Sequence, residues 1–200
     1  MNLSIIFRRT KIISIFLSLF IFSSIKTYGA ELSDISVSGI DVLTDEQDLQ
    51  AQDAIEKIPD DIIRLFHEKG GKLIFQKKPI ILDDSNDEVL GAYWPSTYKI
   101  VIRAMPRIYE GTQSSIKKTI FHEYGHFIYH NSVDRLSAES RKILENTYRY
   151  YQKYDPLCSD PNETFACVYS WYYGDMAEIS PDMKTVIKEA ENLCKGNSQS

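Results

Sequence analysis

The pentapeptide His122-Glu123-Tyr124-Gly125-His126 constrains this chain more than any other stretch, because it has the form H-E-x-x-H. Its two histidines are four residues apart, so an α-helix places both imidazoles on one face, about one turn from each other. Two imidazoles in this arrangement can bind a single zinc ion. Only three of the positions are fixed, so the interpretation depends on a surrounding helix, a third ligand and a suitable compartment.

An amphipathic helix is predicted around the motif. It begins at one of two adjacent serines, 114 or 115, and ends near Asn131. With residues placed about every 100°, six apolar residues share the side that we expect to face the core: Ile116, Ile120, Phe121, Tyr124, Phe127 and Ile128. His122, Glu123 and His126 fall on the opposite side with Thr119. The helix can therefore bury its apolar stripe while it directs both imidazoles into a cleft.

A catalytic zinc ion takes three protein ligands and leaves a fourth position for water, so one more ligand is needed. The longer pattern H-E-x-x-H-x-x-G-x-x-H is not met, because Tyr129 and Ser132 stand where glycine and histidine are required. His130 lies another turn along the same rigid helix and would have difficulty reaching a metal held by His122 and His126. We interpret it as a histidine at the cleft edge or on the surface.

Glu163 is the preferred third ligand. It lies on a helix that begins at Asp160, where it shares a side with the small residues Ala166 and Ser170, and small residues permit two helices to approach closely. Glu163 could instead have a purely structural role, because Asp160 and Glu163 also form a capping-box-like pair at the start of the helix. This alternative stays open. Glu178 is the reserve candidate.

Helices outnumber strands in the rest of the chain. The elements expected before the motif are a helix from Thr44 to the break at Pro59, a helix from Asp60 to Gly70, strands 72–76 and 79–82, and a hairpin of strands 89–94 and 98–104. In strand 98–104 apolar and basic residues alternate, which predicts a half-buried strand near the sheet edge. Helices 137–152 and 160–173 follow, then a last helix capped by Ser180. The pattern predicts an α+β fold, helix-rich with a small sheet before the motif helix.

The N-terminus resembles an export signal. Three basic residues precede an apolar run from Ile12 to Phe22, and Thr27–Ala30 offers a small-residue cleavage site. This run of about eleven residues is shorter than the roughly 20 that a membrane-spanning helix needs. We therefore expect a signal peptide over residues 1–29, a single domain over 30–200, secretion from the cell, and no stable membrane association after cleavage.

The net charge limits the kinds of binding partner that we expect, and the cysteine content limits the number of disulfide bonds. The signal segment holds four basic residues and no acidic ones, so the mature chain keeps 19 of its 23 basic side chains against 28 acidic ones. This acidic balance argues against nucleic-acid binding. The three cysteines permit at most one internal disulfide. We weakly prefer a bond between Cys158 and Cys194, because Cys167 falls inside a predicted helix and can be buried there.

Two motifs make the chain similar to a known family. His122-Glu123-Tyr124-Gly125-His126 together with Asn162-Glu163-Thr164-Phe165-Ala166 resembles the anthrax lethal factor-like catalytic domain and the small secreted Pro-Pro endopeptidases, a gluzincin family. The resemblance covers the chain from about Thr44 to the C-terminus. It implies a zincin-like metallopeptidase domain in which His122, His126 and Glu163 bind zinc and Glu123 is the general base.

The resemblance also implies a tyrosine, a few residues before the third ligand, that steadies the oxyanion of the reaction. Tyr154 is the nearest match, although its spacing to Glu163 is about two residues longer than the usual interval of the family. Tyr150 and Tyr151 are the alternatives in the same tyrosine-rich stretch.

These observations predict a secreted, monomeric endopeptidase with one Zn²⁺ per chain, which hydrolyses peptide bonds with activated water and Glu123 as general base. We expect an extended peptide or protein substrate, with the resemblance indicating proline-containing sites. The alternative is a zinc-binding toxin-accessory or protein-binding module on the same fold that has no catalytic activity. An accidental motif, the third reading, predicts no bound metal.

Overall fold

The computed structural model describes most of the chain that follows the predicted signal segment. The described residues are 36–82, 88–104, 108–109, 112–113, 115–152, 158, 160–175 and 178–196. The predicted signal peptide over 1–29 and Tyr154 lie outside this set. Among the helices within it, none is long and apolar enough to cross a membrane.

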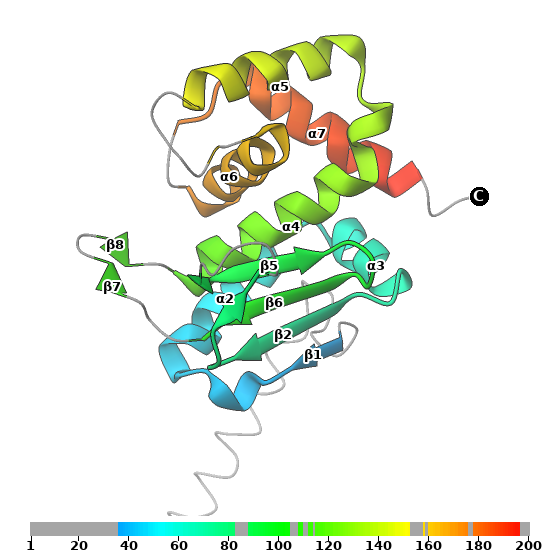
Figure 1. Ribbon diagram of the computed structural model, residues 1–200. Coiled ribbons are helices and arrows are strands. Elements are labelled where there is room, and N and C mark those ends of the chain that lie inside the picture. The colour runs from blue at the N-terminus through cyan, green and yellow to red at the C-terminus, as the bar shows by residue number, and fades with distance from the viewer. Residues whose placement is uncertain are drawn as a thin grey trace, which may run out of the picture.

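A four-stranded sheet forms one layer of the domain (Figure 1). Its strands, in spatial order, are β1 (Ser36–Ser38), β2 (Lys72–Gln76), β6 (Lys99–Arg103) and β5 (Gly91–Trp94). β1, β2 and β6 are parallel, and β5 runs antiparallel to β6. Two smaller sheets pair β3 (Ile80–Ile81) with β4 (Glu88–Val89), and β7 (Ile108–Tyr109) with β8 (Thr112–Gln113). The predicted hairpin and the predicted strand 72–76 are confirmed.

The prediction that strand 98–104 lies at the sheet edge is wrong. β6 lies between β2 and β5, so β5 is the edge strand on this side of the described sheet. Ile100, Val101 and Ile102 are all buried, because Ile100 and Ile102 face the main core while Val101 faces a second apolar cluster under β3 and β4. The polar residues that suggested an edge stand at the two ends of the strand. The pattern of a hairpin indicates only the pairing of its own two strands. It could not show that β2, which is distant in the sequence, pairs with the other side of β6.

Helices make up the rest of the domain. They are α2 (Asp45–Lys57), α3 (Asp60–Glu68), α4 (Ile116–Ser132), α5 (Ala138–Tyr151), α6 (Pro161–Gly174) and α7 (Pro181–Lys195), with 3₁₀ turns η2 (Ile40–Val42) and η3 (Val133–Arg135). Their starts follow the sequence signals: Thr44 and Gln47 form a complete capping box, and the side chain of Ser180 accepts from the backbone of Met183. The predicted α+β class is confirmed.

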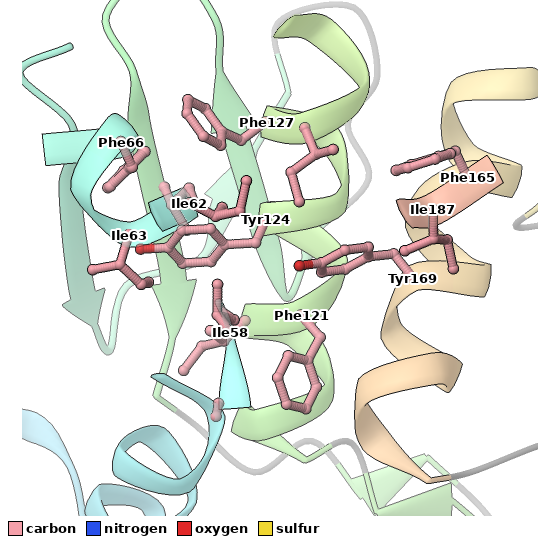
Figure 2. Close-up of a cluster of buried hydrophobic side chains, with 14 of the residues drawn as sticks. Ile58, Ile62, Ile63, Phe66, Phe121, Tyr124, Phe127, Phe165, Tyr169 and Ile187 are labelled. Carbon is pink, nitrogen blue, oxygen red and sulfur yellow. The ribbon is translucent and has the colours of Figure 1, made fainter. Parts of the chain in front are cut away.

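The motif helix α4 lies between the sheet and the layer of α5, α6 and α7 (Figure 1). All six residues of its predicted apolar side are buried. Tyr124 and Phe127 pack on Phe66 of α3, with ring centroids 5.2 Å apart in each pair. Figure 2 shows Phe165 and Tyr169 of α6 on the opposite flank of the same helix. Contacts on both flanks hold α4 in place.

The three cysteines of the chain are buried and form no disulfide, so the weak preference for a bond between Cys158 and Cys194 is wrong. Cys194 lies on α7 and directs its Sγ atom to the carbonyl of Ile128 on α4, 3.6 Å away. Cys167 is buried within α6, as predicted.

Candidate metal centre

Two helices bring the candidate ligands together. His122 and His126 lie on α4, and Glu163 lies in the first turn of α6. The helices meet where Gly125 faces Ala166: a Cβ atom added at Gly125 would lie only 2.7 Å from the Cα atom of Ala166. The two backbones therefore approach more closely than a side chain at position 125 would permit. The sequence identified the small residue on α6 but not its counterpart inside the motif.

The ligand atoms of the three side chains lie close together. The Nε2 atoms of His122 and His126 are 3.0 Å apart, and the Glu163 carboxylate oxygens lie 3.3 Å from the first and 3.4 Å from the second. Tetrahedral ligands about 2.0–2.1 Å from a zinc ion are separated by roughly 3.3 Å. The three residues together can hold a metal ion. Sequence reasoning named all three.

The ligand side chains are partly exposed to solvent. The side chains of His122, His126 and Glu163 keep 23%, 12% and 34% of their surface exposed. A metal ion can therefore enter, and a fourth ligand such as water can approach from the exposed side. An enclosed structural site, in contrast, fills all four positions with protein side chains.

Asn162 orients one of the histidines. Its Oδ1 atom lies 2.9 Å from Nδ1 of His126. Because an amide oxygen only accepts, Nδ1 must carry the proton and the lone pair of Nε2 is directed to the other ligands. Asn162 belongs to the second motif, but its contact with His126 was not predicted. Its position directly before the acidic ligand was the available signal.

The capping alternative for Glu163 is resolved by Asp160. The Asp160 side chain accepts from the backbone N–H groups of Asn162 and Glu163, at 2.7 Å and 2.9 Å. This caps the helix start without the Glu163 side chain, whose carboxylate is turned to the histidines. Glu178, the reserve candidate, is exposed and does not belong to the ligand group.

The three ligands influence each other's protonation. Burial by itself would lower the pKa of His122, but the hydrogen bond and charge of Glu163 raise it above its ordinary value. Burial and the charge of His122 lower the pKa of His126. Burial would raise the pKa of Glu163, but both histidines lower it. The charge of Glu163 therefore favours a proton on His122.

Glu123 lies in a different environment from the ligands. It was expected on the cleft side of the helix, but only 4% of its surface is exposed because β5 covers it. Burial raises its pKa to about 7, against the charge of His122 and a hydrogen bond from the backbone of Tyr93, which lower it. The carboxyl group can therefore both accept and release a proton near neutral pH.

The other sequence-predicted residues that the structure describes lie outside the ligand group. Tyr154 is outside the described residues. Tyr151 packs on Trp171, with ring centroids 5.1 Å apart, and Tyr150 is 60% exposed. His130 is exposed, as predicted, and its ring lies 6.2 Å from that of Tyr93.

Comparison with known proteins adds nothing to this geometry, since no protein-family model and no curated protein matches the chain.

Proposed function

We propose that this chain is a secreted zinc endopeptidase with a zincin-like fold, one Zn²⁺ per chain, and His122, His126 and Glu163 as ligands. The observation that carries the proposal is the convergence of these side chains beside the buried carboxylate of Glu123. Two imidazoles and one carboxylate form a ligand set of catalytic zinc sites. A structural zinc site needs no acidic residue between its histidines, so Glu123 favours catalysis.

The chemistry follows from the groups present. A zinc ion held by His122, His126 and Glu163 would act as a Lewis acid, which lowers the pKa of a water molecule to about 7 and polarises a substrate carbonyl. Glu123 accepts a proton from the attacking water and later donates it to the leaving amine nitrogen. Asn162 keeps the proton of His126 on Nδ1 throughout. The family resemblance assigns to Tyr154 the hydrogen bond to the oxyanion.

An extended peptide can align along β5, the edge strand, rather than along strand 98–104. The Leu90 carbonyl accepts from the backbone of Arg103 at 2.8 Å, and Gly91 pairs with Ile102. Because alternate residues of an antiparallel strand bond to the partner, the backbone groups of Gly91 and Tyr93 point away from β6. The N–H of Tyr93 already donates to the Glu123 carboxylate, so a substrate can pair with the other backbone groups on this side of β5, a recurrent mode of peptide recognition. The preference for proline-containing sites rests on the family resemblance.

The test compares metal content and cleavage. The purified mature chain is measured for bound zinc and incubated with a diverse peptide library, beside Glu123→Gln and the matched control Glu178→Gln, which makes the same change at an exposed glutamate. We expect about one zinc per chain in all three proteins, with cleavage by the native chain and by Glu178→Gln only.

Other outcomes contradict the proposal in distinct ways. Zinc bound without cleavage by any of the three proteins favours the non-catalytic zinc-binding module. Equal cleavage by the native chain and Glu123→Gln excludes Glu123 as the base. A protein that binds no zinc makes the H-E-x-x-H motif accidental.

A further inference from the structure

Gly91 on the edge strand lies directly against the carboxylate of Glu123. A Cβ atom added at Gly91 would lie 2.5 Å from Oε1 of Glu123, 3.0 Å from its Cδ atom and 2.5 Å from the Cγ2 atom of Thr119. Real Cβ atoms do not approach other heavy atoms this closely. The Glu123 carboxylate thus occupies the place that a side chain at position 91 would take.

The backbone of Gly91 does not require glycine. Among the described glycines, positive φ angles occur at Gly39 and Gly70, and Gly91 is not one of them. It lies in a regular antiparallel strand, paired with Ile102. An alanine can adopt this conformation, so the space beside Glu123 is the physical reason for glycine here.

Tyr93 and Thr119 lie on either side of the space between Gly91 and Glu123. Tyr93, the next residue on the same face of β5, packs on Phe127 of α4 with ring centroids 6.0 Å apart. Thr119 precedes Glu123 by one turn on α4, and its hydroxyl donates to the carbonyl of Ser115 at 3.3 Å. The Glu123 side chain therefore lies between a strand and a helix that are packed together on both sides of it.

We propose that Gly91 is a positioning residue, which acts through Glu123 by leaving the space in which the general base is held. This inference rests on the proposed function. The proposed metal ligands come from α4 and α6, and none of them supplies an atom among the three nearest to an added Cβ at Gly91. A methyl group at position 91 therefore moves the base relative to the metal while the ligand set stays intact.

The first experiment separates binding from turnover. Gly91→Ala should keep about one zinc per chain and an unchanged KM, and lose about 100-fold in kcat, since a displacement near 1 Å costs this much in a positioned group. Gly196→Ala is the control, because a Cβ atom there meets nothing within 4 Å. An unchanged kcat for Gly91→Ala overturns the proposal, and so does the loss of bound zinc.

The double variant Gly91→Ala, Thr119→Ser tests whether Gly91 positions Glu123 or only allows β5 to pack against α4. Serine keeps the hydroxyl of Thr119 and removes the methyl group that the new Cβ atom would meet. The added Thr119→Ser change should recover part of the thermal stability lost in Gly91→Ala and leave kcat low. Recovery of kcat together with stability would mean that Gly91 serves only helix–strand packing.

A stability cycle on metal-free protein tests the contact without any activity. Gly91→Ala should lower Tm by about 4 °C in the native background, and by less in Glu123→Ala, where the carboxylate is absent and the contact with Thr119 remains. Equal shifts in both backgrounds overturn the proposed contact. If the native chain cleaves nothing, the proposed function fails, while this cycle still decides whether Gly91 holds Glu123.

Discussion

The Nδ1 atom of His126 donates a hydrogen bond to Oδ1 of Asn162 across 2.9 Å, and this bond joins the middle of α4 to the first turn of α6. It selects the tautomer whose Nε2 lone pair faces the other ligands. Asn162 also precedes Glu163, so one turn of α6 supplies both a ligand and the group that orients another ligand.

Asn162→Ala should weaken zinc binding about 10- to 100-fold, because His126 loses the partner that holds its ring and tautomer. Zinc affinity is measured by competition with a chromophoric chelator. Asn192→Ala, at an exposed position of α7, is the control and should bind zinc like the native chain. Equal affinity of Asn162→Ala and the native chain would exclude an orienting role for Asn162.

Gly125→Ala should separate α4 from α6. The new Cβ atom would meet the Cα atom of Ala166 at 2.7 Å, a backbone contact that no side-chain rotation relieves. We expect a loss of about 2 kcal/mol in stability, or roughly 5 °C in Tm, and weaker zinc binding because Glu163 moves with α6. Thermal unfolding and zinc titration measure the two effects. A variant with native Tm and native affinity would show that the helices are not in close contact.

Tyr124→Phe should stabilise the protein by about 1 kcal/mol. Tyr124 is fully buried between α3 and α4 (Figure 2), and its hydroxyl has no hydrogen-bond partner among the described residues. Phenylalanine has no hydroxyl, so folding of the variant avoids the free-energy cost of taking an unpaired hydroxyl out of water. Urea unfolding measures the change, and zinc content should stay the same. A less stable variant would reveal a partner for the hydroxyl, such as a buried water molecule.

The pH dependence of stability should contain a contribution from Glu189. The Glu189 carboxylate on α7 accepts from the hydroxyl of Ser140 and from the backbone and hydroxyl of Ser137, the last two at 2.6 Å and 3.0 Å. The hydrogen bond from Ser140, and those from Ser137, lower the pKa of Glu189 below its ordinary 4.5. The stabilisation is therefore complete above the unfolded pKa and is lost as pH falls through the folded pKa.

Glu189→Gln should accordingly be less stable than the native chain at neutral pH, by about 1 kcal/mol. The difference should shrink as pH falls below the ordinary value of 4.5 and through the lowered pKa of folded Glu189. Urea unfolding across this range measures it, with Glu56→Gln as an exposed control on α2. A difference that stays constant with pH would exclude the carboxylate charge as its source.

Removal of the metal should lower thermal stability. A ligand that binds only the folded state adds about 2.7 kcal/mol at a concentration of 100 Kd, which corresponds to roughly 8 °C in Tm. Chelation should reverse this shift, and Glu163→Ala should greatly reduce it because one of three ligands is missing. The same Tm with zinc and with chelator would contradict metal binding by the folded chain.

Local patterns predicted the parts of the site that depend on helix geometry. Residues four apart face the same side of any α-helix, so His122 and His126 were certain to be neighbours once α4 was recognised. The capping signals at Thr44 and Asp160 marked helix starts for the same reason, because each cap involves residues within one turn. Glu163 followed from the need for a third ligand and from the small residues on its side of the helix.

Tertiary packing decided what these patterns could not contain. Asn162 and His126 are separated by 36 positions in the sequence, and Gly91 reaches Glu123 only because β5 pairs with β6 at the sheet edge. The hydrophobic periodicity of a single helix or strand does not indicate such contacts between distant segments.

By itself, the sequence determined which side chains share a helix face, where the helices begin, and which residues can serve as metal ligands. These properties depend on hydrogen bonds and rotations within a few residues. Only the tertiary structure decided that β5 and not β6 is the edge strand, that Glu123 is buried beneath Gly91, and that the cysteines form no disulfide. These depend on which distant segments pack together, and that choice is made by the burial of apolar surface over the whole domain.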